Sequence, residues 1–318
     1  MTRLRLTGNA LRVLAAYCAA VLLFIIGELV HPGFASFGSV TSILLVASFV
    51  GLVAAGQCFV VLVGGIDLSV PWVLNAAAIL LVTSSLGLDS RAPYAVGLTL
   101  GMGALAGFAN GAGVIWFGVP AVVMTLAMNG IMEGLALGLS GGMTCTACAS
   151  YAPPVIQAAV HDVWLGVPAA LWLWVIVIAV VSFMLGLTRF GRATYAIGNN
   201  ARAAFLAGIN VNLTTVFLYV MSGIFSALAG ILLVGFGGQA SLGMGSPYLF
   251  QSIAAVVVGG VSILGGKGNY LGAAAGAVSL TALVSVLLAL NMPDYGRSII
   301  YGVVILVLLL LYGREQRE

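Results

Sequence analysis

The acidic residue Asp67 is the side chain with the greatest capacity for chemistry in this sequence. It stands in an otherwise apolar stretch, between the pair Gly64-Gly65 and Ser69. A carboxylate in an apolar environment is costly, so such a residue usually has a function. Two roles fit the pattern: Asp67 contacts a solute, or it caps the first turn of the helix that follows. Spacing alone leaves both open.

Glu133 is the second candidate, because it lies one helical turn after Asn129 and the two side chains can face one groove. A path for a polyhydroxylated solute would need such groups, with aromatic rings such as Trp72 and Trp116 nearby. Alternatively, Glu133 lies near the outer surface and is hydrated. Five amide side chains either line such a path or form hydrogen bonds between neighbouring helices: Gln57, Asn75, Asn110, Gln239 and Gln251.

The glycine-rich segment Gly260–Gly268 looks like a nucleotide-binding loop but does not match one. The P-loop pattern needs glycine at Val261 and serine or threonine at Gly268. No Ser-His-Asp set or metal-ligand cluster can be assembled around His31 and His161. We therefore expect no enzymatic activity, no metal and no cofactor in this chain. Its work must be driven by an ion gradient or by ATP and Mg²⁺ used in a partner ATPase.

Composition assigns the chain to the membrane. Hydrophobic residues make up 62% of its 318 residues and charged residues 6%, against ~25% charged in a soluble domain. Runs such as Val303–Leu311 do not alternate between polar and apolar positions as barrel strands do, so the spanning elements are predicted to be helices. The net charge of +3 comes from basic clusters that indicate topology, not affinity for nucleic acid.

The spacing of apolar runs predicts one all-α domain over residues 1–318, a polytopic bundle of about ten transmembrane helices. A helix needs ~20 apolar residues to cross a hydrocarbon core of ~30 Å. The predicted spans are Val13–Val30, Ile43–Val63, Trp72–Leu86, Tyr94–Ile115, Ala121–Leu139, Ala169–Leu187, Leu213–Val234, Tyr248–Leu264, Leu271–Leu290 and Ile299–Tyr312.

Basic residues predict the orientation of this bundle. Residues 140–168 contain no Arg or Lys and are predicted to form an external loop. The segment Thr188–Asn212 carries Arg189, Arg192 and Arg202, three of eleven basic residues, and is predicted to be cytoplasmic. The N- and C-termini, each beside basic residues, are predicted to be cytoplasmic as well.

Thr188–Asn212 is predicted to be a compact element and not a loose tether. Ala201–Leu206 favours a short helix, and Gly191, Gly198 and Gly208 are expected to break or cap it. Such an element would suit the docking of a partner. An ordinary positively charged loop that obeys the positive-inside rule explains the arginines equally well.

The four cysteines fall into two pairs. Cys18 and Cys58 lie in apolar runs and are predicted to pack as small hydrophobic residues. Cys145 and Cys148 form a CxxC in a polar loop, without the βαβ context or second ligand pair that a redox or metal role needs. Free packing cysteines are the favoured interpretation of this pair, and a disulfide is the alternative.

The sequence contains a faint internal echo. Val61–Ile66 and Val256–Val261 each end a predicted span with a Gly-Gly pair and precede an alanine-rich span. Internal repeats of this kind are common in transporters, although Gly-Gly pairs also arise by chance in Val- and Ala-rich helices.

Three stretches resemble the permease subunits of bacterial ABC importers for sugars, a group that includes ribose, xylose, arabinose and galactofuranose permeases. Gly56–Ser69 is similar to the family's GQ…GGIDLS signature. Thr188–Ile209 resembles its cytoplasmic coupling loop, and Ile253–Gly268 resembles its late IAAVVxGG…GGxG segment. The resemblance covers nearly the whole chain.

The resemblance implies a protein of the bacterial inner membrane, surrounded by lipid, whose pore pairs this permease with a copy of itself or with a second permease. Its other partners would be a cytoplasmic ABC ATPase and a periplasmic sugar-binding protein. The coupling contacts implied are Arg189, Gly191, Arg192, Gly198, Arg202, Ala203, Ala204 and Gly208. The candidates for the translocation path or gate are Gln57, Gly64, Gly65, Asp67, Ser69, Asn75, Asn129 and Glu133.

Three positions depart from the family pattern. Arg202 stands where the EAA-xxx-G coupling motif carries Glu, which predicts an acidic groove on the cognate ATPase. Pro71 replaces a usual Gly, and Glu133 stands where a basic residue is common. The expected cargo is a monosaccharide, a pentose or a hexose. The alternatives are a nucleoside, autoinducer-2 or a polyol in the same architecture, or a gradient-driven secondary transporter.

Overall fold

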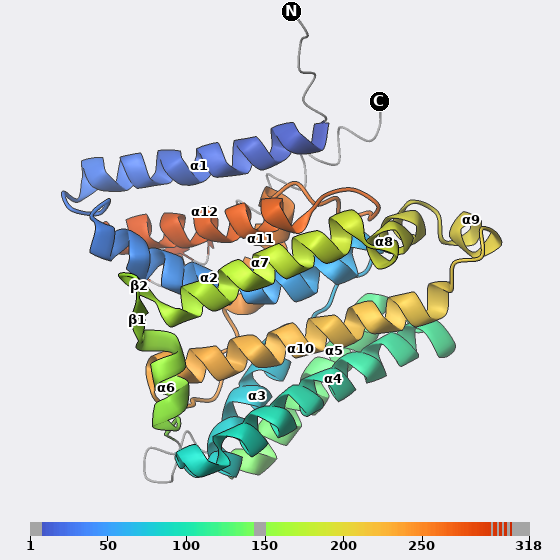
Figure 1. Cartoon of the computed structure of the whole chain (residues 1–318), viewed down its shortest axis with the longest axis horizontal. Helices are drawn as coiled ribbons and strands as arrows, with labels where there is room; N and C mark the ends of the chain where they lie inside the picture. Colours follow the sequence, from blue (N-terminus) through green and yellow to red (C-terminus); the bar gives the residue numbers. More distant parts are fainter. Residues whose placement is uncertain are drawn as a thin grey trace, which may run out of the picture.

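The chain is described by a computed structural model over residues 8–142 and 151–293, with 295–297, 299–300, 302–303 and 306. It is a bundle of helices with one small hairpin (Figure 1). The elements are α1 Gly8–Val30, α2 Phe37–Leu62, α3 Val70–Ser85, the 3₁₀ turn η1 Asp89–Arg91, α4 Ala92–Trp116, α5 Ala121–Ser140, α6 Pro154–His161, β1 Val163–Trp164, β2 Val167–Pro168, α7 Ala169–Leu187, α8 Arg189–Asn199, α9 Ala201–Leu206, α10 Val211–Gly237, α11 Tyr248–Val258 and α12 Tyr270–Ala289.

Seven helices of the described chain are long and apolar enough to cross a membrane: α1, α2, α4, α5, α7, α10 and α12. They correspond to seven of the predicted spans. Two other predicted spans correspond to shorter apolar helices: α3 has 16 residues, close to its predicted length, whereas α11 has 11 and is shorter than predicted. At ~1.5 Å per residue, α11 covers about half of a ~30 Å hydrocarbon core. The count of ten and the cytoplasmic termini stay predictions, and most of Ile299–Tyr312 lies outside the described residues.

Both short helices adjoin a break in the backbone. The prediction that one helix runs over Tyr248–Leu264 is wrong at its end, because α11 stops at Val258 and Gly260 takes a φ of +81°. α2 likewise stops at Leu62, before Gly64 with a φ of +79°. Such left-handed backbone carries a steric penalty for residues other than glycine.

The two breaks are built alike. At the end of α2, Gly64 N–H donates to Val61 O at 2.9 Å, and Gly65 N–H donates to Val60 O at 3.0 Å. At the end of α11, Gly260 N–H donates to Val257 O at 2.8 Å and Val261 N–H to Val256 O at 3.1 Å. This is the paired pattern of a Schellman motif. The sequence echo is therefore structural, with Gly64 equivalent to Gly260, one position away from the predicted alignment.

Helix α10 is at the centre of the bundle, in contact with α2, α3 and α4. Three glycines spaced four apart on α4, Gly103, Gly107 and Gly111, lie on one helix face against it. A Cβ at any of them would collide with the α10 backbone, for example with the carbonyl of Tyr219 opposite Gly107. Small residues at this spacing let two helices approach closely in a membrane. We call this contact the α4–α10 glycine seam.

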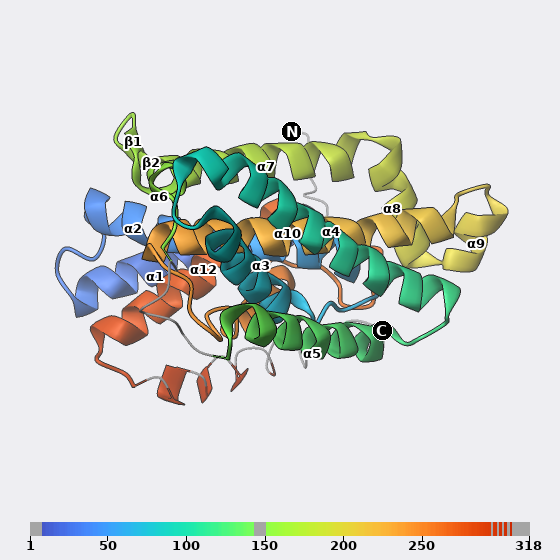
Figure 2. The ribbon, with the colours of Figure 1, turned by 90° about the horizontal axis from the view of Figure 1, so that it is seen from below.

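The two ends of the bundle carry different elements. α8 and α9 lie together at one end, and the hairpin β1–β2 with α6 lies at the opposite end (Figures 1 and 2). The hairpin pairs Val163 with Pro168 and Trp164 with Val167. The predicted orientation places the α8–α9 end in the cytoplasm and the hairpin end outside.

The structure tests the local predictions for the coupling element and for the cysteines. Gly191 and Gly198 do not break the coupling element, because both lie inside α8. The predicted helix Ala201–Leu206 is confirmed as α9, and Gly208 follows it with a φ of +81°. Cys58 is buried as predicted, whereas Cys18 is exposed on α1. Cys145 and Cys148 lie outside the described residues.

Candidate functional site

The two glycine breaks lie against each other at the end of the bundle that carries α8. Gly266 N–H donates to the carbonyl of Leu62, the last residue of α2, at 2.9 Å. A Cβ on Gly265 would meet the backbone at Gly64 and Leu62. The close approach therefore requires glycine, and it ties the α2–α3 break directly to the α11–α12 break.

Helix α8 is bonded to the same junction. The Tyr195 hydroxyl donates to Gly268 O at 2.8 Å, and Asn199 Nδ2 donates to Gly266 O at 3.2 Å. Gly198 lies so close that a Cβ there would meet Leu62 O and Gly266 N. We call α8 with the two breaks the α8 junction. Any displacement of α8 must be transmitted to both breaks or must rupture these bonds.

Local chemistry explains why α8 sits in this way. The Thr188 hydroxyl accepts from Gly191 N–H at 3.2 Å and so caps the helix. The ring of Phe190 lies 6.3 Å from that of Phe59 on α2 and 5.2 Å from that of Phe217 on α10. Burial, with a smaller contribution from Cys58, raises the pKa of Tyr195 to about 12, so its hydroxyl stays protonated and can donate.

The outer surface of the coupling element presents apolar groups beside basic ones. Asn200 caps α9 by accepting from Ala203 N–H at 2.9 Å. Phe205 and Leu206 are 67% and 78% exposed at the tip of α9. Arg202 is also exposed, as are Arg189 and Arg192 on α8, whereas Ala204 is buried. Exposed aromatic, aliphatic and arginine side chains together are typical of a protein-binding patch.

Asp67 lies beyond the α8 junction, in the segment between α2 and α3, and is almost completely buried. Its Oδ1 accepts from the N–H and the hydroxyl of Ser69, at 2.9 and 2.6 Å. Its Oδ2 accepts from the Ser222 hydroxyl of α10 at 2.7 Å. Asn110 of α4 donates to Ser69 Oγ at 2.9 Å. We call these four side chains the Asp67 cluster.

The same segment is also attached to α5. The Leu68 N–H donates to the Thr125 hydroxyl at 3.0 Å, and that hydroxyl lies within hydrogen-bonding distance of two carbonyls, Ala121 O at 2.9 Å and Ile66 O at 3.2 Å. The α2–α3 break therefore contacts α4, α5 and α10 through side chains. Asp67 lies three residues before α3 begins and does not cap its first turn, because Ser69 is at the N-cap position and no side chain there caps the helix. The expected contact with a solute stays a prediction.

Other predicted path residues are buried without joining this cluster. Both amide atoms of Gln57 on α2 and of Asn75 on α3 have no hydrogen-bond partner among the described residues. Asn129 Oδ1 on α5 has none either within that part of the chain. Glu133 is half-buried on the same helix. Buried amide groups without partners are unusual in folded proteins, so these residues stay candidates for contact with a solute.

Several residues of the site were not found from the sequence. Tyr195 and Asn199 lie inside the predicted coupling segment, but nothing in their spacing indicated that they face Gly268 and Gly266. Ser222 lies in an apolar span as an ordinary small residue. Among the described residues, no group of three His, Cys, Asp or Glu side chains is placed to hold a metal ion.

Comparison with known sequences identifies the protein family of this chain. The profile of the family described as "branched-chain amino acid transport system / permease component" matches residues 39–309. The chain belongs to this family. The permease is 34% identical to the autoinducer 2 import system permease protein LsrC of Shigella flexneri, over 95% of this chain and 87% of that protein. It is also 34% identical to the ribose import permease protein RbsC of Haemophilus influenzae, over 93% of this chain and 91% of that protein.

These relatives confirm the predicted resemblance at the level of the family. The permease is a multi-pass protein of the inner membrane and a transport subunit of the sugar-type ABC importer class. Members of this class work in general with an ATPase and a substrate-binding protein. No solved structure matches this chain.

Proposed function

We propose that this permease carries a monosaccharide, a pentose or a hexose, across the inner membrane, driven by ATP hydrolysis in a cytoplasmic ABC ATPase that docks on α8 and α9. The α8 junction is the observation that carries this proposal. It joins an element with an exposed, basic and apolar tip to both helix breaks through three hydrogen bonds: Tyr195 to Gly268, Asn199 to Gly266 and Gly266 to Leu62.

The mechanism follows from those connections. When the ATPase closes and moves α8, the bonds to Gly266 and Gly268 draw the α11–α12 break with it. The bond from Gly266 to Leu62 carries the displacement to the end of α2 and so to the Asp67 cluster. The glycines that form both breaks allow backbone rotation that other residues resist. A two-state element biased by a partner then opens the path on one side at a time.

The remaining partners are proposed on the same basis. A second permease, a copy of this chain or a different one, would complete the pore, and a periplasmic sugar-binding protein would deliver the solute. ATP and Mg²⁺ would be used by the ATPase alone. Autoinducer-2 is the nearest alternative cargo, because one of the similar permeases is named for its import; a nucleoside or a polyol are further alternatives.

Co-purification with a co-expressed ABC ATPase of the same importer tests the docking surface. The double variant Phe205→Ser with Leu206→Ser removes the apolar tip of α9, and replacement of Arg202–Gly208 by a Gly/Ser linker removes the whole element. We expect both to lose most of the bound ATPase that the wild type retains. The matched control is Leu165→Ser, which changes an exposed leucine of the hairpin at the opposite end and should retain the ATPase.

Two results would contradict the proposal. Equal retention of the ATPase by wild type and α9 variants would show that docking occurs elsewhere. Absence of the ATPase from all preparations, the wild type included, would remove the ATP-driven importer from consideration and leave the gradient-driven carrier as the function to pursue.

A further inference from the structure

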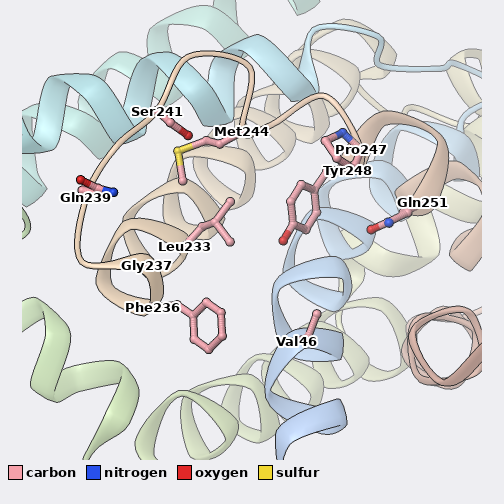
Figure 3. Close-up of a pocket in the computed structure, with 10 residues that line it drawn as sticks. All are labelled: Val46, Leu233, Phe236, Gly237, Gln239, Ser241, Met244, Pro247, Tyr248 and Gln251. Carbon is pink, nitrogen blue, oxygen red and sulfur yellow. The ribbon is translucent and has the colours of Figure 1, made fainter. Parts of the chain in front are cut away.

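A cavity of about 420 Å³ opens at the end of the bundle opposite to α8, at the end of α10. It lies between α2, α10, α11 and the connection 238–247 that joins α10 to α11 (Figure 3). Its size is at the small end of the range, ~300–1,000 Å³, in which proteins bind small molecules. The predicted orientation places its mouth outside the cell.

The lining combines aromatic rings with uncharged polar groups. Figure 3 shows the rings of Phe236 and Tyr248 on two sides of the cavity, with Ser241 on the connection directed inward toward Met244. Gln239 lies on the connection at the rim, and Gln251 lies on the side of Tyr248. None of the ten lining residues is Asp, Glu, Lys, Arg or His.

This chemistry selects a class of ligand. Aromatic faces with a few hydroxyl and amide groups bind a molecule that has both apolar faces and hydrogen-bonding edges. A zwitterion such as an amino acid would bring two charges into a site that offers no countercharge from the side chains that line it, which is costly. The cavity therefore suits a neutral, polyhydroxylated solute.

The connection that lines one side of the cavity packs on the first turn of α3. Gly245 in the connection 238–247 lies so close to the carbonyl of Pro71 that a Cβ would collide with it. Pro71 is in the first turn of α3, two residues after Ser69 of the Asp67 cluster. The connection thus packs on the helix that follows the Asp67 cluster, and α3 adjoins the α2–α3 break that the α8 junction would move.

We propose that this cavity is the outer binding station of the permease for a neutral monosaccharide-sized solute, and that the connection 238–247 is the gate beneath it. The inference rests on the proposed function, since it assigns a site to the cargo proposed there. It adds residues that the sequence left undecided: Gln239 and Gln251 belong to this station, whereas Gln57 and Asn75 lie on other parts of α2 and α3.

Protection from a thiol reagent tests the station. Ser241→Cys is introduced into a permease whose four native cysteines are replaced by alanine, and the permease is reconstituted in vesicles with its ATPase and binding protein. A membrane-impermeant maleimide is applied to the outer face, and the rate of labelling is measured with and without a 10-fold excess of D-ribose, D-xylose, L-arabinose, autoinducer-2 or L-leucine. Uptake of each radiolabelled compound is measured in parallel. Ser246→Cys is the control, on the same connection but not among the lining residues.

We expect at least one of the sugar-type compounds to be taken up and the same compound to slow labelling at position 241 at least threefold, with no change at 246. Ser241→Leu, which fills the cavity, should raise the half-saturating concentration for uptake at least fivefold while ATPase binding is unchanged.

Each other outcome counts against the inference. Uptake without protection at 241 overturns the binding station and leaves the proposed function standing. Protection by L-leucine alone overturns the assignment of solute class. Reaction of Ser241→Cys only with a membrane-permeant maleimide means that the cavity faces lipid. If none of the sugar-type compounds is taken up although the ATPase binds, the proposed cargo is wrong and the station falls with it.

Discussion

Both carboxyl oxygens of Asp67 accept hydrogen bonds from neighbouring serines. Three hydrogen bonds from two serines converge on it in a site that water does not reach. Each of these donors would carry a desolvation cost if it were left without its acceptor. At the scale of the residue, Asp67 therefore locks the α2–α3 break to α10, and its chemistry in this state is structural.

Substitution of Asp67 separates this role from proton transport. Asp67→Ala leaves three buried donors unpaired and is expected to lower stability by several kcal/mol, at ~1–3 kcal/mol for each group. Asp67→Asn keeps the shape and one acceptor and should lower it by ~1–2 kcal/mol with uptake still driven by ATP. The measurements are the thermal midpoint in detergent and ATP-dependent uptake in vesicles. Abolished uptake in Asp67→Asn, with the fold and the ATPase coupling intact, would favour the gradient-driven carrier.

Removal of the hydroxyl oxygen of Tyr195 tests the α8 junction. Tyr195→Phe removes the bond to Gly268 and should cost ~0.5–1.5 kcal/mol of stability, while uptake per ATP hydrolysed falls several-fold. Because the pKa of Tyr195 is raised to about 12, the neutral donor is the form present up to pH 9, and coupling in the wild type should not change between pH 6 and 9 on its account. Tyr94→Phe, an exposed tyrosine of α4, is the control. An unchanged ratio of uptake to hydrolysis in Tyr195→Phe would exclude the relay.

At the scale of the element, the breaks distinguish this bundle from a set of straight spans. The sequence predicted Ala169–Leu187 as it is found, and it placed α5 and α12 within a residue at each end. It did not predict that α11 ends at Val258, because Val261, Ile263 and Leu264 continue the apolar run through the glycines. Hydropathy records which residues avoid water, and it does not record where the backbone turns.

Glycine-to-alanine substitution in α7 and α8 tests whether close backbone contact, and not flexibility, is what the junction needs. Gly198→Ala places a methyl group against Leu62 O and Gly266 N, and we expect a loss of ~1–3 kcal/mol and a clear drop in coupled uptake. Gly186→Ala, with open space around it, should instead gain ~0.5–1 kcal/mol from helix propensity. The measurements are the thermal midpoint and the uptake rate of each variant. Equal behaviour of the two variants would mean that α8 is not packed on the breaks.

At the scale of the whole molecule, the contacts join segments far apart in the sequence. α1 packs on α12, and α4 on α10. The family and the membrane class were accessible from composition and motifs. The pairing of the two breaks, the attachment of Tyr195 to Gly268 and the cavity under Tyr248 were not, because each depends on which helices become neighbours, and similar apolar helices carry little information about their partners.

The predicted orientation of the whole molecule can be tested with two cysteines in a cysteine-free background. Ser36→Cys lies in the connection between α1 and α2, and Arg202→Cys lies on α9. In intact spheroplasts we expect an impermeant maleimide to label position 36 at once and position 202 only after the membrane is opened. The reverse order of labelling would invert the permease and place the α8 junction outside.

The α4–α10 glycine seam has a consequence for how the protein is made. α10 begins 95 residues after α4 ends, and ribosomes add about 5–20 residues per second. The glycine face of α4 therefore waits in the bilayer for ~5–20 s before its partner is synthesised. During that interval the nascent chain exposes a smooth, small-residue helix face to any other helix in the membrane. Chains truncated before α10 never bury this face, and we expect quality-control proteases to remove them.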